Sequence, residues 1–136
     1  MASTGTAQRN IEMARKGYQA FNEMKIEEAM ATIHEDIVWH NGGDNPLSGE
    51  YKGKQAVMEL FAKFGQLTEG TSEFDVHDIL ASDDHTVVIG TATATRHGRT
   101  HASRFVDIVH PAEDGRAKEF WRFVEDQAAD DEFFKE

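Results

Sequence analysis

The chain has 136 residues, a formal net charge of −11 and no cysteine. This length suits one domain with its own core, so we expect a single domain over residues 1–136. The lack of cysteine excludes disulfides and thiolate metal sites, and the acidic charge argues against a nucleic-acid partner. There is no apolar run of membrane-spanning length and no secretory pattern at the start, so we expect a cytoplasmic protein with no membrane partner.

The first half of the sequence has the apolar spacing of amphipathic helices. We expect helices at residues 7–24, 26–34 and 54–67, each with one buried face. A short strand is expected at residues 37–39. The Asn, Gly and Pro residues that follow, at positions 41–53, are typical of loops and turns.

After Gly70 the sequence alternates between apolar and polar residues, which predicts strands. Four strands are expected, at residues 72–81, 86–96, 100–110 and 116–124. Short segments rich in Asp and Gly separate them. An antiparallel meander that follows a set of helices indicates an α+β fold, with the helices on one face of the sheet.

One carboxylate, Asp107, lies within an otherwise apolar strand between Phe105 and Val109. An acid in such a position costs free energy unless it is paired, hydrogen-bonded or used in chemistry. Asp107 is therefore the first candidate for a functional residue.

The turns between the last three strands predict which side chains share a face with Asp107. A two-residue turn at Gly98–Arg99 places Gly90 opposite Asp107, and a turn near residues 113–114 places Phe120 there. The shared face then contains Gly90, Ala92, Ala94, Phe105, Asp107, Phe120 and Arg122. Small and aromatic side chains with a few polar groups, covered by helices, are typical of a ligand pocket.

The opposite face of these strands is also apolar, and no element of the chain remains to cover it. Its residues are Ile89, Thr91, Val106, Ile108 and Trp121. A second copy of the chain is the simplest cover, so we expect a homodimer through the sheet.

Several motifs occur in an order that is shared with a known family. They are Trp39-His40, Asn45-Pro46-Leu47-Ser48-Gly49, Tyr51-Lys52-Gly53, Asp107-Ile108, and Asp114-Gly115-Arg116 with Glu119-Phe120-Trp121. Over residues 7–134 the chain resembles the SnoaL-like group of the NTF2-like superfamily, which includes polyketide cyclases and relatives of ketosteroid isomerase. The resemblance implies a cone: a curved antiparallel sheet wrapped around N-terminal helices, with an internal pocket.

The resemblance also implies acid–base chemistry by Asp107 on a small, apolar, carbonyl-containing substrate, without a cofactor. The departures from the family pattern are specific. The catalytic tyrosine of ketosteroid isomerase falls at Gly17, next to Tyr18, and its general base falls at Asn41, next to His40. A non-catalytic binding or dimerisation domain of the same fold is the alternative function.

The sequence is consistent with two roles for Asp107. It is either a proton-transfer group in an apolar pocket or the partner of Arg122 in a buried ion pair. His40 is a second candidate catalytic residue, although Trp39 has the opposite strand parity and only one of the two can point inward. The expected ligand-binding residues are Trp39, Asn41, Tyr51, Phe105, Phe120 and Arg122. No metal site is expected, because the histidines near the hairpin turns do not share a ligand spacing.

Overall fold

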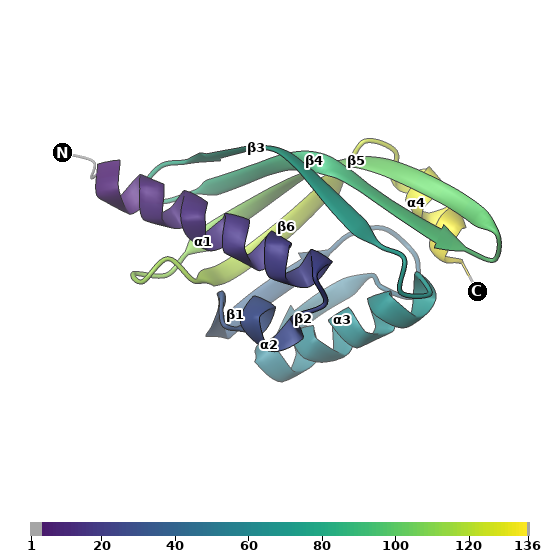
Figure 1. Cartoon of the computed structure of the whole chain (residues 1–136). Coiled ribbons are helices and arrows are strands. Elements are labelled where there is room, and N and C mark those ends of the chain that lie inside the picture. The colour runs from purple at the N-terminus through teal and green to yellow at the C-terminus, as the bar shows by residue number, and fades with distance from the viewer. Residues whose placement is uncertain (1–3, 136) are drawn as a thin grey trace.

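A computed structural model of the chain describes residues 4–135. In chain order its elements are α1 (Thr4–Asn22), α2 (Ile26–Met30), β1 (Ile33–Asn41), β2 (Gly49–Lys52), α3 (Lys54–Leu67), β3 (Glu73–Ala81), β4 (Thr86–Arg96), β5 (Arg99–Pro111), β6 (Ala117–Val124) and α4 (Gln127–Phe134). The sheet curves over α1, with α3 beside β1 and β2, and α4 lies near the β4–β5 hairpin (Figure 1). The α+β class predicted from the sequence is confirmed. No helix within the described residues is long and apolar enough to cross a membrane.

The six strands form one sheet in the order β2-β1-β6-β5-β4-β3. Strands β3 to β6 make the predicted antiparallel meander. The sheet is mixed rather than wholly antiparallel, because β1 runs parallel to β6. This pairing joins the helical half of the chain to its last strand and closes one side of the cone.

Strand β1 is longer than the sequence pattern indicates, and the turn segment that follows it contains a strand. The register of β1 against β6 shifts between Ile33 and Val38, so alternation is lost over the first half of β1. The residues that the pattern assigns to a turn form β2, which pairs with β1 from Val38 to Asn41. Helix α2 ends at Met30 rather than at residue 34, and Ile33 is buried in the sheet instead of on a helix.

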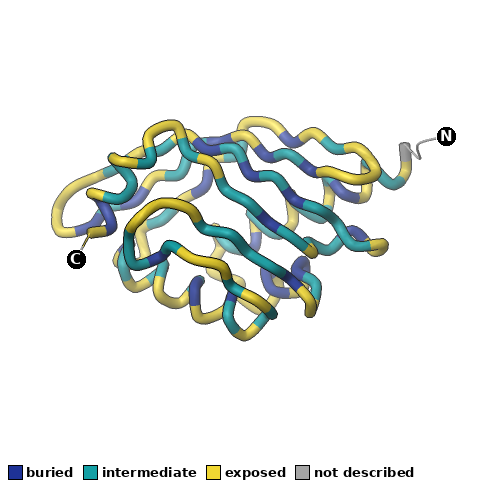
Figure 2. The backbone as a smooth tube through the Cα atoms, turned by 180° about the vertical axis from the view of Figure 1, so that it is seen from behind, coloured by how far each residue is buried: buried dark blue, intermediate teal, exposed yellow. Residues whose placement is uncertain are grey.

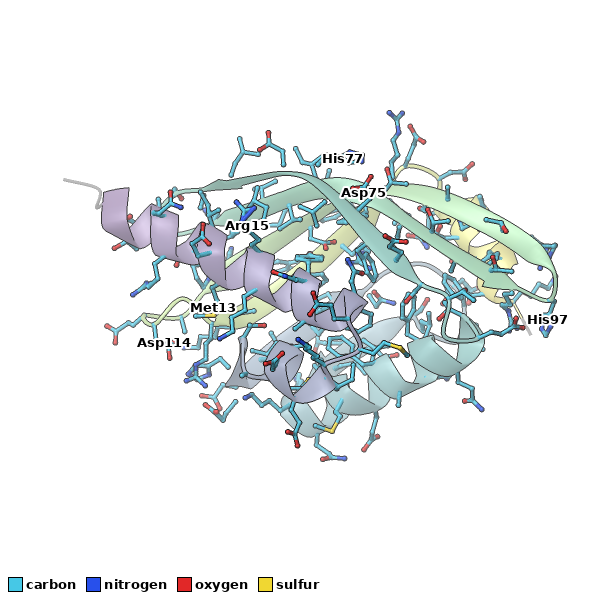
Figure 3. All side chains as sticks on the ribbon, in the orientation of Figure 1. Met13, Arg15, Asp75, His77, His97 and Asp114 are labelled. Carbon is cyan, nitrogen blue, oxygen red and sulfur yellow. The ribbon has the colours of Figure 1, made fainter. Side chains whose placement is uncertain are left out.

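The β4–β5 turn lies one residue earlier than predicted. Arg96 pairs with Arg99, and the two residues between them, His97 and Gly98, have positive φ angles of 51° and 76°. His97 lies at the tip of this hairpin (Figure 3). Such angles suit the type I′ turn, which matches the twist of the strands. The shift moves every cross-strand partner by two positions and leaves each side chain on its predicted face.

The core fills the space between the sheet and the helices. From α1, the side chains of Ile11, Ala14, Tyr18 and Phe21 pack against a buried cluster on β3, β4 and β5. From α3, Val57 and Leu60 are buried. Buried and more exposed residues alternate along the strands (Figure 2), which gives the sheet an inner and an outer face.

Candidate functional site

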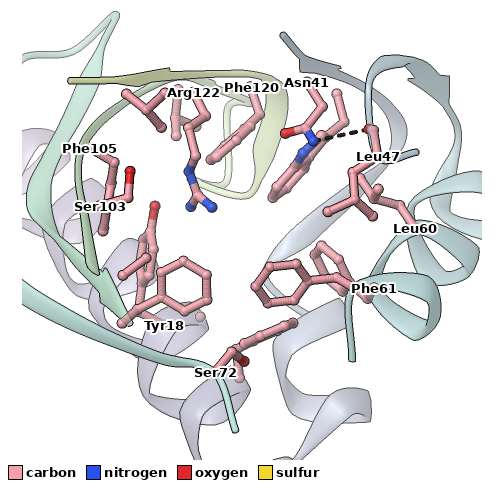
Figure 4. Close-up of a pocket in the computed structure, with 18 of the residues that line it drawn as sticks. Tyr18, Asn41, Leu47, Leu60, Phe61, Ser72, Ser103, Phe105, Phe120 and Arg122 are labelled. Atoms are coloured by element: carbon pink, nitrogen blue, oxygen red, sulfur yellow. Dashed lines mark hydrogen bonds between the residues drawn. The ribbon is translucent and has the colours of Figure 1, made fainter. Parts of the chain in front are cut away.

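An internal cavity of about 180 Å³ lies between the inner face of the sheet and the helices. Its wall is mostly apolar and aromatic (Figure 4). Trp39 stacks on Phe120, with 3.6 Å between ring centroids, and meets Phe61 edge to face at 5.3 Å. This wall follows from strand parity, because Trp39 and Phe120 are partners in the parallel β1–β6 ladder.

Asp107 is fully buried and both of its carboxylate oxygens are occupied. Arg122 donates from Nε to Oδ1 and from Nη2 to Oδ2, each at 2.7 Å. The hydroxyl of Tyr18, on α1, donates to Oδ2 as well. Tyr18 and Arg122 line the cavity whereas Asp107 does not, so these two side chains separate the carboxylate from the space where a ligand would lie.

Arg122 is held at this position by its strand and by three aromatic rings. It is the direct cross-strand partner of Asp107. Its guanidinium carbon lies 4.8 Å from the ring centroid of Phe74, 4.7 Å from that of Phe105 and 5.6 Å from that of Phe120. A cation over aromatic faces is stabilised by the ring quadrupoles. Asp107 accepts two of the five guanidinium N–H groups, which leaves donors for the cavity.

The pKa values of Tyr18 and Arg122 are both raised in this cluster. Burial raises the pKa of Tyr18 well above its usual range, and the negative charge of Asp107 raises it further. Burial alone would lower the pKa of Arg122, but the attraction and hydrogen bonds of Asp107 outweigh that effect and raise it. Tyr18 is therefore a neutral donor and Arg122 a fixed cation at neutral pH.

Five of the eight residues predicted for the site line the cavity. They are Trp39, Asn41, Phe105, Phe120 and Arg122. The Asn41 amide donates from Nδ2 to the carbonyl of Leu47 at 3.0 Å, which leaves its Oδ1 as an acceptor.

The structure does not place the other candidates in the cavity wall. Tyr51 donates its hydroxyl to the Leu47 carbonyl at 2.8 Å and packs behind the lining residues. His40 points to the outer face of the sheet, where it stacks on Trp121 and lies 2.8 Å from Glu119. Strand parity explains this position, because the neighbouring Trp39 faces inward. His40 and Asp107 therefore do not share one site.

The cavity is also lined by polar residues that were not predicted for the site from the sequence. Tyr18 belongs to the apolar stripe of α1, and only its hydroxyl distinguishes it from a core residue. His101 and Ser103 have the same strand parity as Asp107, a signal that was present in the sequence. The His101 ring lies 2.6 Å from the Asp130 carboxylate of α4 and stacks on Phe133.

Helix α4 closes the end of the cavity next to the β4–β5 hairpin. Its Phe133 and Phe134 are buried and line the cavity. The buried side chain of Arg96 donates to the backbone carbonyls of Phe133 and Lys135, each at 3.2 Å. This segment is acidic in composition, but it forms a helix whose two aromatic residues line the cavity. Within residues 4–135 there is no group of three His, Cys, Asp or Glu that could hold a metal ion.

The fold and this pocket define the class of the protein. The family model for the SnoaL-like domain matches residues 14–120, and the chain belongs to this family. No curated protein matches the sequence.

Several solved structures share the fold of this chain. Bal32a, from a soil-derived mobile gene cassette, is 29% identical with a TM-score of 0.91, covering 96% of this chain and 99% of its own. A protein of unknown function with a cystatin-like fold from Xanthomonas campestris is 25% identical with a TM-score of 0.86, covering 93% and 98%. An NTF2-like protein from Burkholderia xenovorans, 20% identical with a TM-score of 0.75 and covering 92% and 96%, shares the fold.

Proposed function

We propose that this chain binds a small, mainly apolar organic molecule through an electron-rich oxygen, such as that of a ketone, enolate or phenolate. One observation carries the proposal: Arg122 is a cation fixed in the aromatic wall of a mostly apolar cavity. Its orientation is set in advance by Asp107, so little ordering is required when a ligand oxygen arrives. The cavity volume of about 180 Å³ suits a molecule of one or two rings.

A second candidate function is acid–base catalysis of the isomerase or cyclase type. It is favoured by the chain of hydrogen bonds from Tyr18 through Asp107 to Arg122, which reaches the cavity at both ends. In this function Arg122 would stabilise the oxygen of an enolate while the Asp107 carboxylate takes the proton from the adjacent carbon and later returns it. Asp107 would act only after Arg122 or Tyr18 moved away from it, because both of its oxygens are occupied.

The binding function is tested with 1-tetralone, an uncharged two-ring ketone, against its parent hydrocarbon tetralin. Trp39 lines the cavity, so its fluorescence reports occupancy. We expect the ketone to bind about tenfold more tightly than the hydrocarbon, because a hydrogen bond to a charged donor contributes about 1.5–3 kcal/mol. This preference should disappear in Arg122→Gln and persist in Arg104→Gln, which alters an exposed arginine on the outer face. Equal affinities for the two probes in the natural protein would contradict the proposal.

Catalysis is tested on the same bound ketone by proton exchange. In D₂O, enolisation replaces the hydrogens at C2 of 1-tetralone with deuterium, which NMR detects directly. The catalytic function predicts exchange that is faster with the protein than without it and is lost in Arg122→Gln even when the ketone saturates the protein. Binding without accelerated exchange would exclude this candidate and retain the first.

We also propose that the outer face of the sheet forms a homodimer interface. Ile89, Val106 and Phe123 are direct neighbours in one row across β4, β5 and β6. Ile89 and Phe123 remain 38% and 55% exposed in the single chain. A continuous apolar row of this kind favours a self-complementary contact between two copies.

A further inference from the structure

The amide of Asn10 is a buried polar group at the other end of the cavity from α4. Asn10 is 1% exposed and lies on α1, two helical turns before Tyr18. Its Nδ2 donates to the carbonyl of Ser82 at 3.2 Å, which fixes the orientation of the amide. Its Oδ1 accepts no hydrogen bond from any residue between 4 and 135.

The surroundings of this oxygen belong to the cavity. Asn10 and Gly115 both line it, together with Thr86 of β4. A Cβ atom at Gly115 would lie 3.3 Å from this buried oxygen and 3.1 Å from Nε of Arg9, so the absence of a side chain there leaves space beside Oδ1. Gly115 has a φ of +91°, which disfavours any residue with a side chain at this position.

A buried acceptor without a donor lowers the stability of a protein. An external hydroxyl or amine that donates to Oδ1 would remove this cost. We infer that Asn10 forms a second binding subsite, which accepts a hydrogen bond from a hydroxyl group of the ligand.

This inference rests on the proposed function for its second anchor, Arg122. Asn10 and Tyr18 are separated by about 12 Å along the axis of α1. The ligand class is thus a hydroxylated ketone or phenol, with an acceptor oxygen near Arg122 and a donor hydroxyl near Asn10. Two scaffolds span a suitable range of lengths, namely 1-tetralone and the longer 4-acetylbiphenyl.

The test compares each ketone with its hydroxylated form, 6-hydroxy-1-tetralone or 4-acetyl-4′-hydroxybiphenyl. For at least one scaffold, we expect the hydroxyl to improve affinity by about fivefold to tenfold, the effect of one hydrogen bond. In Asn10→Leu this gain should vanish while the parent ketone keeps its affinity. In the natural protein, the side-chain amide signals of Asn10 in a ¹⁵N NMR spectrum should shift with the hydroxylated probe and not with its parent, a result that does not depend on the folding of a variant.

The outcomes separate the two proposals. If Arg122→Gln weakens both members of each pair but no hydroxyl effect depends on Asn10, the subsite is wrong and the proposed function stands. If no probe binds the natural protein, the proposed function and the subsite both fail. A crystal structure with the hydroxylated probe in which a water molecule remains on Oδ1 would also overturn the subsite.

Discussion

Arg122 lies directly opposite Asp107 in the β5–β6 ladder and closes both oxygens of its carboxylate. The Asp107 carboxylate orients the Arg122 guanidinium, and Arg122 lines the cavity. A ligand in the cavity would therefore contact Arg122 rather than Asp107.

Asp107→Asn is expected to destabilise the fold. The change leaves the Arg122 cation without its partner in a site where its side chain is only 20% exposed. Removal of one partner of a buried pair costs about 3–5 kcal/mol, and because Arg122 is partly exposed we expect a loss of about 3 kcal/mol. Urea unfolding measures it. Glu125→Gln, which removes the partner of exposed Arg104, should leave the midpoint almost unchanged. Equal midpoints for both variants would show that the Asp107 pair does not stabilise the fold.

Tyr18 should make the stability of the protein fall at high pH. Burial and then the charge of Asp107 raise the pKa of Tyr18 above its ordinary value of 10.0, so the unfolded chain loses this proton first. The stabilisation is complete below pH 10 and is lost as the pH rises through the folded-state pKa. Urea unfolding at pH 8 and pH 11 should show a smaller decline for Tyr18→Phe than for the natural protein. Tyr51, whose pKa burial also raises, is present in both and cancels. A decline of the same size in both proteins would contradict the assignment.

Arg96→Met should release α4 from the end of the cavity. The buried arginine is 6% exposed and donates to two carbonyls at the C-terminal end of this helix. Since hydrogen bonds from a charged donor contribute about 1.5–3 kcal/mol, amide exchange in residues 127–134 should accelerate by about tenfold or more. Mass spectrometry of the exchanged peptides measures this rate. Lys135→Gln, which changes an exposed side chain of the same segment, should leave the rate unchanged.

Phe123→Glu should convert the proposed dimer into monomers. The phenyl ring is 55% exposed on the outer face, and two charges facing each other across a symmetric contact would repel. Size-exclusion chromatography with light scattering gives the mass directly. Met24→Glu is the matched control, because Met24 is 70% exposed in the turn after α1, outside the sheet. A natural protein that is already monomeric at high concentration would exclude the interface.

The sequence predicts the inner face of the sheet well, and the reason is the two-residue period of strands. Both hairpins are shifted by two positions from their expected register, yet Phe105, Asp107, Phe120 and Arg122 remain on one face. The same shift turns Arg122 from a diagonal neighbour into the direct partner of Asp107. The position of the turn depends on which residues adopt positive φ, and His97 is one that composition does not indicate.

Other features depend on contacts that no local pattern contains. The parallel pairing of β1 with β6 and the strand β2 arise from partners far along the chain. Tyr18 reaches Asp107 across 89 positions, and its helical stripe looks the same with or without that contact. The acidic composition of α4 favours a solvated tail. Its Phe133 and Phe134 are buried only because they pack against residues from distant parts of the chain, such as Leu60.

The contacts that Asp107 makes with Arg122 and with Tyr18 span very different lengths of chain, so we expect them to form at different stages of folding. Arg122 and Asp107 are 15 positions apart in one hairpin, so their contact requires the closure of only a short loop. The contact with Tyr18 spans 89 positions, and that between His40 and Glu119 across the β1–β6 ladder spans 79. Because long loops close late and at greater entropic cost, the charged pair should form early in folding and the cavity around it last.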